Sequence, residues 1–157
     1  MVVENKDGIV RSSVDIGKLR FVPDALPDLN LNEIRLECKQ VVGNSPIECV
    51  PVAIEAEDEP SAIKASIELN HPLFYLKESS EILLVRDGKA VDRHKDASPR
   101  HVSNGLELAK CIRLGIEPCI IRPPTSLNDV VEQLKIAMFL VNSESIERLR
   151  QASVYVI

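Results

Sequence analysis

The sequence predicts an α/β protein with a mixed central sheet flanked by helices, folded as a single domain over residues 1–157. Short apolar runs typical of strands alternate with longer segments of helical periodicity. Turn signals separate these segments, and Asp87-Gly88 is the strongest of them. The chain has 157 residues, with three Phe, two Tyr and no Trp, so its core has to be built mainly from Val, Ile, Leu and Ala. This length is typical of one domain.

Short strands separated by polar turns are predicted for the first third of the chain. Pro23 and Pro27 exclude a long regular helix near them. They leave room only for a short helix, between Lys18 and Val22 or after Pro23. The predicted strands cover residues 8–14, 32–42 and 49–54, and the predicted turns lie at 15–18 and 43–46.

A helix followed by a hairpin is predicted for the middle of the chain. Pro60 and Ser61 open the helix, which runs to about Asn70, and acidic residues precede it where the helix dipole favours them. Extended segments follow over 73–76 and 81–86. Because Asp87-Gly88 suits a two-residue turn, residues 82–86 and 89–93 are expected to pair as a hairpin.

The pattern becomes helical from Ser103, which is the expected N-cap of a helix that Gly115 ends. A short strand over 117–122 follows, and then a long amphipathic helix from Thr125 onward. A last short helix is predicted over 144–152. The apolar tail Val154–Ile157 could pair with a sheet edge or with a second subunit.

Composition excludes several classes of function. The net charge of −5 disfavours attraction to nucleic-acid backbones, and the few aromatic residues argue against a stacking platform for single strands. No apolar run approaches the roughly 18 residues of a membrane span, and no signal-peptide core is present at the N-terminus. We therefore expect a cytoplasmic protein without nucleic-acid or membrane partners. Its dispersed cysteines are expected to be reduced, packed thiols: Cys38, Cys49, Cys111 and Cys119.

Cationic and imidazole side chains gather between residues 86 and 104 of this acidic chain. Such a group is a candidate binder of a small polyanion, for example the phosphates of a nucleotide. The arginines could bind phosphate in a bidentate manner, and the histidines could donate hydrogen bonds or carry protons. The alternative is a set of solvated charges around an exposed hairpin. The candidate residues are Arg93, His94, Arg100, His101 and Asn104.

A second polar cluster, Ser12, Ser13, Asp15 and Lys18, follows the first predicted strand. Two hydroxyl groups, backbone donors and a mobile cation are what a phosphate requires. The glycines do not match a Walker loop. The alternative is a polar turn that caps a following helix.

Two further groups lie between a predicted strand and a predicted helix. The acidic stretch offers carboxylates suited to Mg²⁺ from Glu55, Glu57, Asp58 and Glu59. The alternative is that these carboxylates only stabilise the positive end of the following helix.

The loop Arg122–Ser126 lies where ligands gather in open α/β sheets, which makes Thr125 a candidate substrate-binding residue. Thr125 and Ser126 could equally be helix caps.

Together these elements resemble the inosine/xanthosine triphosphate pyrophosphatase fold. In that family the first strand ends in a Ser/Thr-x-Asn-x-x-Lys turn that holds the triphosphate. Ser13-Val14-Asp15-Ile16-Gly17-Lys18 matches this turn with Asp15 in the Asn position. The acidic helix start of the family corresponds to Glu57 and Asp58, and Ser98-Pro99 is similar to a Ser-Pro loop in one branch of the fold.

The chain departs from that family in lacking its Asp-Ser/Thr-Gly-Leu strand, which supplies a catalytic carboxylate, and in having Pro23 within the expected helix. A site altered in this way should bind a nucleotide without freely hydrolysing it. In this respect the chain resembles the small, dimeric guanylyltransferases of iron-guanylylpyridinol cofactor assembly in methanogens.

That resemblance implies a Mg²⁺-dependent transfer of GMP from GTP to a pyridinol hydroxyl, with release of pyrophosphate, by a homodimer. Lys18 and Arg93 or Arg100 would neutralise phosphate charge, and Glu57 or Asp58 would hold the metal. Two alternatives stay open. One is a pyrophosphatase of non-standard purine nucleoside triphosphates, and the other is a non-catalytic module that binds a ligand or oligomerises.

Overall fold

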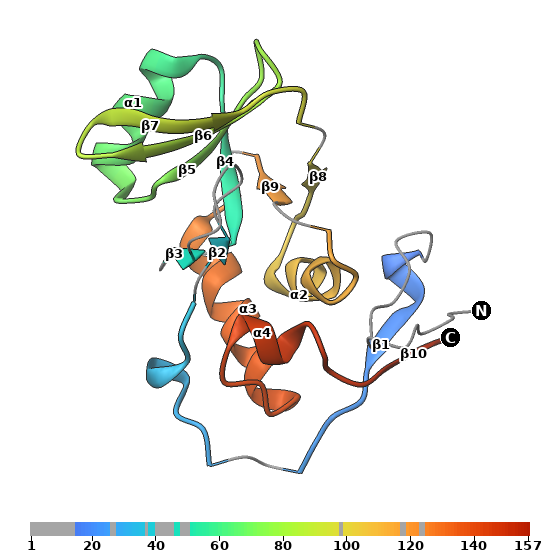
Figure 1. The fold of residues 1–157 in the computed structure, drawn as a ribbon. Coiled ribbons are helices and arrows are strands. Elements are labelled where there is room, and N and C mark those ends of the chain that lie inside the picture. The colour runs from blue at the N-terminus through green and yellow to red at the C-terminus, as the bar shows by residue number, and fades with distance from the viewer. Residues whose placement is uncertain are drawn as a thin grey trace.

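A six-stranded mixed sheet in the order β7-β6-β5-β4-β9-β8 forms the centre of the protein (Figure 1). The computed structural model describes residues 15–25, 28–36, 38–39, 46–47, 51–97, 99–116, 119–122 and 125–157. Strands β5, β4, β9 and β8 run parallel, whereas β6 and β7 are antiparallel to their neighbours. The bounds are β4 Val52–Ala56, β5 Leu73–Leu76, β6 Glu81–Arg86, β7 Lys89–His94, β8 Arg100–His101 and β9 Cys119–Ile121.

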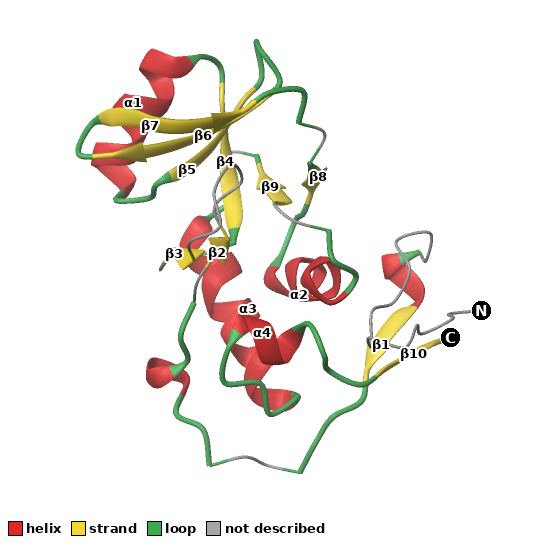
Figure 2. Ribbon diagram, in the orientation of Figure 1, coloured by secondary structure: helices red, strands yellow, loops and turns green. Residues whose placement is uncertain are grey.

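Helices accompany this sheet, which confirms the predicted α/β class with a mixed central sheet (Figure 2). None of the helices in the described part of the chain is long and apolar enough to cross a membrane. The helices are α1 Glu59–Leu69, α2 Gly105–Arg113, α3 Leu127–Leu140 and α4 Ile146–Leu149, with short 3-10 helices η1 Ile16–Lys18 and η2 Leu31–Glu33.

The two faces of the sheet carry different side chains because successive strand residues point in opposite directions. Ile54, Phe74 and Ile121 belong to the main core, which also contains the buried faces of α2 and α3. Ala53 and Leu73, on the other face, belong to a smaller buried cluster. Residues of β4 therefore alternate between the helix-covered face and the opposite face.

Helix α2 is fixed against α3 at Gly105. A Cβ atom at this position would overlap the backbone of Val130 and Leu134, so only glycine permits the close approach. The Gly105 N–H also donates to Oε1 of Gln133 at 2.8 Å. This contact fixes the start of α2, shortly after His101 at the end of β8.

A separate two-stranded sheet joins β1, Leu19–Phe21, to β10, Val154–Val156, in antiparallel register. The pair lies side by side, away from the central sheet (Figure 1). The apolar tail thus pairs with a strand of its own chain. A further pair joins β2, Cys38–Lys39, to β3, Pro46–Ile47.

Several predicted elements are confirmed. Helix α1 ends at Asn70, whose φ of 50° places it in the left-handed region. The hairpin of β6 and β7 turns at Asp87 and Gly88, which both have positive φ. Gly115 follows α2 with a φ of 79°. At these positions the local residue chemistry and the tertiary structure agree.

Other predictions are wrong. The first of the two places left open for a short helix, between Lys18 and Val22, holds strand β1, because residues 19–21 pair with the distant β10. The strand expected over 32–42 is replaced at its start by η2, Leu31–Glu33. The N-cap of α2 is Asn104 and not Ser103, since the Asn104 side chain accepts from the N–H of Glu107 at 2.8 Å. The strand predicted over 8–14 lies outside the described residues.

Candidate functional site

The carboxyl ends of β4, β9 and β8 bring together Glu55, His101 and Arg122. Glu55 lies on β4, His101 is the last residue of β8, and Arg122 follows the end of β9. The three strands are parallel neighbours, so their ends meet at one edge of the sheet. Ligands of open α/β sheets bind at this kind of edge. We call these three residues the Glu55 cluster.

Glu55 is the least exposed member of the cluster, and the two cationic groups lie against it. Its side chain is 11% exposed, against 43% for His101 and 63% for Arg122. Nε2 of His101 lies 2.8 Å from Oε2 of Glu55. Nε of Arg122 lies 3.4 Å from the same oxygen. One carboxylate oxygen therefore orients both an imidazole and a guanidinium group.

Hydrogen bonding with His101, supported by the charge of Arg122, lowers the pKa of Glu55, although burial opposes this shift. An ionised carboxylate only accepts hydrogen bonds, so we assign the proton of the His101 ring to Nε2, which donates to Glu55. Nδ1 then keeps its lone pair when the ring is neutral. A carboxylate-oriented imidazole of this type is suited to accept a proton from a substrate.

Arg122 is held weakly in the cluster. Its Nη2 lies 3.0 Å from Nε2 of His101. With the proton on Nε2, this contact places two N–H groups against each other and is not a hydrogen bond. The remaining bond to Glu55 is long at 3.4 Å. A mostly exposed guanidinium with such partners can turn toward an incoming anion at low cost.

A cavity of about 450 Å³ adjoins the same strand ends on the helix-covered face. Ile54 and Ile121, which directly precede Glu55 and Arg122, form part of its apolar wall. The predicted substrate residue Thr125 lines it, and the N–H of Thr125 donates to the carbonyl of Arg122 at 3.0 Å. The neighbouring Ser126 caps α3, so one of the two predicted caps is confirmed.

Arg93 does not join the Glu55 cluster. Its guanidinium bonds to Glu59 at 2.6 Å and to Glu81 at 3.1 Å. Both carboxylates raise the pKa of Arg93, with Glu59 having the larger effect. Because Glu59 begins α1 and Glu81 begins β6, Arg93 links a helix start to the hairpin. We call these three residues the Arg93 cluster.

The remaining residues of the predicted cationic segment are distributed around β7, β8 and α2. His94 is exposed at the end of β7, and Asn104 caps α2. Arg100 is exposed on β8. The hydrogen bond with Cys119 lowers the pKa of Cys111, burial opposes this shift, and the charge of Arg100 adds to the lowering. Of this segment, only His101 lies in the Glu55 cluster.

The packed thiols predicted for Cys111 and Cys119 are confirmed, since both cysteines are free and buried. The side chains of Cys38 and Cys49 lie outside the described residues.

The predicted phosphate turn is only partly described. Asp15 caps η1, and its Oδ1 accepts from the N–H of Gly17 at 2.9 Å. This agrees with the alternative interpretation of a polar turn that caps a helix. Lys18 is exposed at the end of η1. Ser12 and Ser13 lie outside the described residues.

The predicted Mg²⁺ ligands follow β4 directly. Oδ1 of Asp58 accepts from the N–H of Ser61 at 3.0 Å, and hydrogen bonding with Ser61 lowers the Asp58 pKa. Asp58 thus caps α1, whereas Glu57 is exposed. The described residues contain no group of three or more His, Cys, Asp or Glu able to hold a metal ion. One carboxylate together with substrate phosphates is nevertheless a common arrangement for Mg²⁺, and Glu57 fits it.

Sequence reasoning placed Glu55 with the acidic stretch, Arg122 with the loop after a strand and His101 with the basic segment. It did not predict that these three residues meet. The sequence offered one signal for this, because Glu55 and Arg122 each lie at the end of an apolar run. The order of the strands in the sheet, which brings these ends together, was the missing information.

Comparisons with known proteins give one short match. The chain is 35% identical over 65 aligned residues to isopentenyl-diphosphate delta-isomerase from Methanocaldococcus jannaschii. The match covers 33% of this chain and 18% of the isomerase, so the chain spans less than a fifth of the length of that relative. No family model matches the chain, and no solved structure matches it at a significant level.

Proposed function

We propose that this protein is a nucleotidyltransferase that uses the Glu55 cluster to transfer GMP from GTP to a pyridinol-type hydroxyl acceptor. The observation that supports this proposal is the contact of one mostly covered carboxylate with an imidazole and an exposed guanidinium at the ends of parallel strands. This arrangement offers a proton acceptor beside an anion-binding cation.

Each member of the cluster has a role in the proposed reaction. Arg122 binds a phosphate of GTP, and Nδ1 of His101 accepts the proton of the acceptor hydroxyl. The hydroxyl oxygen then bonds to the α-phosphorus as the bond from that phosphorus to the bridging oxygen breaks, and pyrophosphate leaves. Glu55 positions His101 and stabilises the imidazolium that forms. The contribution of the protein is chiefly positioning and charge stabilisation.

The adjoining cavity offers an apolar wall for a flat ring. Ile54 and Ile121 supply this wall, and Thr125 supplies a polar group near its edge. Pockets of several hundred Å³ that combine apolar walls with a few polar groups are typical of small-molecule sites. Because Glu55 projects from the opposite face of the sheet, a substrate in this cavity would reach the Glu55 cluster over the ends of β4 and β9. In the proposal the cavity receives the acceptor ring or the base.

The remaining expectations belong to the same proposal. The fold would be related to the inosine/xanthosine triphosphate pyrophosphatases, and the protein would act in the cytoplasm as a homodimer. Mg²⁺ would neutralise phosphate charge, with Glu57 as its protein ligand. Arg100 would act on more distant phosphate oxygens. We assign no phosphate contact at this cluster to Lys18, because it lies on η1 beside the β1–β10 pair, away from the central sheet (Figure 1). We assign no phosphate contact to Arg93, because two carboxylates already bind its guanidinium.

The test is incubation of the full chain with Mg²⁺ and GTP, with and without a hydroxypyridine acceptor, and identification of products by mass spectrometry. We expect a guanylyl ester and pyrophosphate only when the acceptor is present. GTP binding in its absence, measured by calorimetry, should occur without turnover.

Hydrolysis is the second candidate, because the 43% exposed His101 could take a proton from water as well as from an organic hydroxyl. The same incubation with GTP, ITP and XTP separates the two reactions. Monophosphate and pyrophosphate formed without acceptor would establish a pyrophosphatase and refute the transferase. Neither binding nor turnover of any of these nucleotides would refute both and leave a ligand-binding or oligomerising module.

A further inference from the structure

A second cavity, of about 430 Å³, lies among η1, β1, α2 and α3 and shares no residue with the Glu55 cluster. Its apolar wall comes from the segment after β1, from α2 and from the end of α3. Two cationic residues, Arg20 and Lys110, also line it. The apolar residues are Phe21, Pro23, Leu106, Ala137, Leu140 and Val141. We call this space the Lys110 cavity.

Lys110 is an unusually placed cation. It lies on the buried side of α2 and is only 8% exposed. The protein covers most of the Lys110 stem, and its ammonium group reaches the cavity that the residue lines. No ion pair joins it to a carboxylate in the described part of the chain.

The second cation is not neutralised either. Arg20 donates from Nη1 to the backbone carbonyls of Gly17 at 2.7 Å and Leu19 at 2.9 Å. These bonds fix the guanidinium beside the cavity but bring no negative charge to it. Burial lowers the Lys110 pKa, and the charge of the neighbouring Arg20 lowers it further.

No acidic residue is among those that line the cavity. Glu107 opposes the lowering of the Lys110 pKa from outside this lining. Neither Glu107 nor Asp15 forms an ion pair with Lys110 or Arg20 in the described part of the chain. Two like charges thus face a largely apolar cavity, and a bound anion would relieve both their repulsion and the desolvation of Lys110.

We propose that the Lys110 cavity binds a small organic anion, a carboxylate or a phosphate carried on an apolar body. The anionic group contacts Lys110 and Arg20, and the apolar body packs against Phe21, Leu106 and Leu140. The size of the cavity is in the range of small-molecule sites. This site is independent of the proposed nucleotidyl transfer.

A second copy of this chain is the rival occupant, because Leu106 and Leu140 are 48% and 49% exposed. An apolar protein surface placed here would, however, cover Lys110 and Arg20 without neutralising them, which is unfavourable. Charge complementarity therefore favours an anion.

The test uses isothermal titration calorimetry of the full chain with 2-naphthoate, 1-naphthyl phosphate and, as a cation with the same ring, 2-naphthylmethylamine. We expect at least one of the two anions to bind with one-to-one stoichiometry, and the amine to bind at least tenfold more weakly than that anion. The comparison of the two anions identifies the preferred anionic group. Absence of anion binding, or equal binding of the amine, would overturn the proposal.

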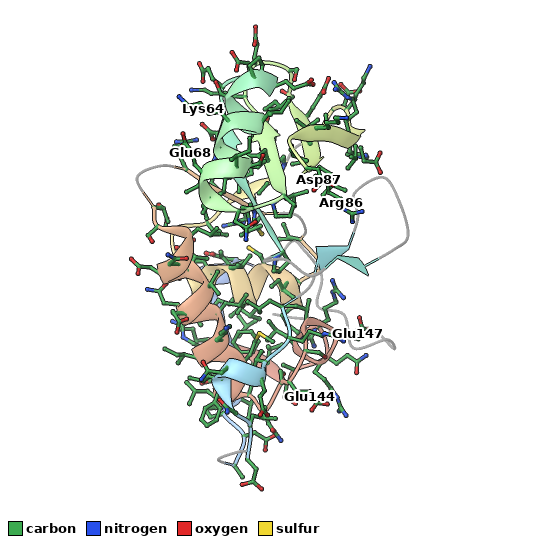
Figure 3. The ribbon with its side chains drawn as sticks, turned by 90° about the vertical axis from the view of Figure 1, so that its left-hand side faces the viewer. Lys64, Glu68, Arg86, Asp87, Glu144 and Glu147 are labelled. Atoms are coloured by element: carbon green, nitrogen blue, oxygen red, sulfur yellow. The ribbon has the colours of Figure 1, made fainter. Side chains whose placement is uncertain are left out.

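Variants then locate the binding site. Lys110→Met keeps the apolar stem, removes the charge and should weaken binding of the preferred anion at least tenfold. Lys64→Met is the matched control, because Lys64 lies exposed on α1 (Figure 3), and it should bind normally. Glu55→Gln should also leave anion affinity unchanged, which separates this site from the proposed catalytic cluster.

A second variant covers the case in which Lys110→Met does not fold. Leu140→Gln changes a half-exposed wall residue and should weaken anion binding several-fold while the thermal unfolding transition is retained. Unchanged affinity in a folded Lys110→Met protein would be evidence against the site. If Leu140→Gln instead dissociates a dimer, as measured by light scattering, and the native chain binds no anion, the face is a subunit interface and the proposal is wrong.

Discussion

Arg93 and Arg122 each contact a poorly exposed glutamate on the same sheet, yet their surroundings differ. Arg93 bonds to Glu59 and Glu81, which are 39% and 13% exposed. Arg122 shares the single carboxylate of Glu55, 11% exposed, with His101. The bonds of Arg93 measure 2.6 and 3.1 Å, whereas Arg122 lies 3.4 Å from its carboxylate.

This difference distinguishes a structural ion pair from a candidate site. The Arg93 cluster has more negative than positive charge, and its guanidinium already has two short carboxylate bonds. The Glu55 cluster has one carboxylate for a guanidinium and an imidazole, so an additional anion can be accommodated. An arginine near a basic sequence segment is thus informative about binding only when its carboxylate partners are known.

The largest effect is expected for Glu55→Gln. Loss of the charge that orients His101 should slow nucleotidyl transfer on the order of 100-fold, which is within the usual contribution of a positioned acid or base. The measurement is the rate of guanylyl ester formation from GTP under single-turnover conditions. Glu59→Gln, which changes the Arg93 cluster in the same way, should remain within about twofold of the native rate. Equal losses in the two variants would contradict the distinction.

Alanine substitutions of Arg122 and Arg93, made one at a time, should have different effects on nucleotide binding. Arg122→Ala should raise the Kd for GTP on the order of tenfold, since a charge-assisted bond to phosphate is lost. Arg93→Ala should leave the Kd unchanged. Calorimetric titration with GTP and Mg²⁺ provides the measurement. If Arg93→Ala weakened GTP binding more than Arg122→Ala, the phosphate site would have to be assigned to the Arg93 cluster instead of the Glu55 cluster.

The same two variants should behave in the opposite order in thermal unfolding. Arg93→Ala should lower the Tm slightly, because Arg93 links the start of α1 to the hairpin. Arg122→Ala should have no measurable effect. The loss in Arg93→Ala should shrink in 1 M NaCl, where exposed ion pairs are screened. A loss of equal size at low and high salt would show that packing, and not charge, is responsible.

The smallest expected effect is the pH dependence of the contribution that Glu55 makes to the free energy of unfolding. Folding lowers the pKa of Glu55, so its ionised form stabilises the folded state at neutral pH. This contribution is lost as the pH falls through the lowered pKa, because the carboxyl group is then protonated in both states. The difference in unfolding free energy between the native chain and Glu55→Gln should therefore shrink from pH 7 to pH 3. The exposed Glu78→Gln is the control, and a constant difference for Glu55→Gln would contradict the expectation.

Much of the fold could be predicted because the responsible chemistry is local. Asp87 and Gly88 adopt the positive φ values that their turn requires, and Asn70 ends α1 in the left-handed region. Local patterns left open a short helix between Lys18 and Val22, but residues 19–21 are extended. Those residues form a strand because β10 supplies hydrogen-bond partners from the far end of the chain. Tertiary pairing overrides such a weak local preference.

The sequence by itself determined the α/β class, the hairpin, the main helices and the presence of charged residues at the ends of apolar runs. Only the tertiary structure decided which of these charges meet. Glu55 contacts His101 and Arg122 across 46 and 67 residues of sequence, through the parallel order β4-β9-β8. Local patterns cannot specify that order, because it depends on the packing of the whole sheet against α2 and α3.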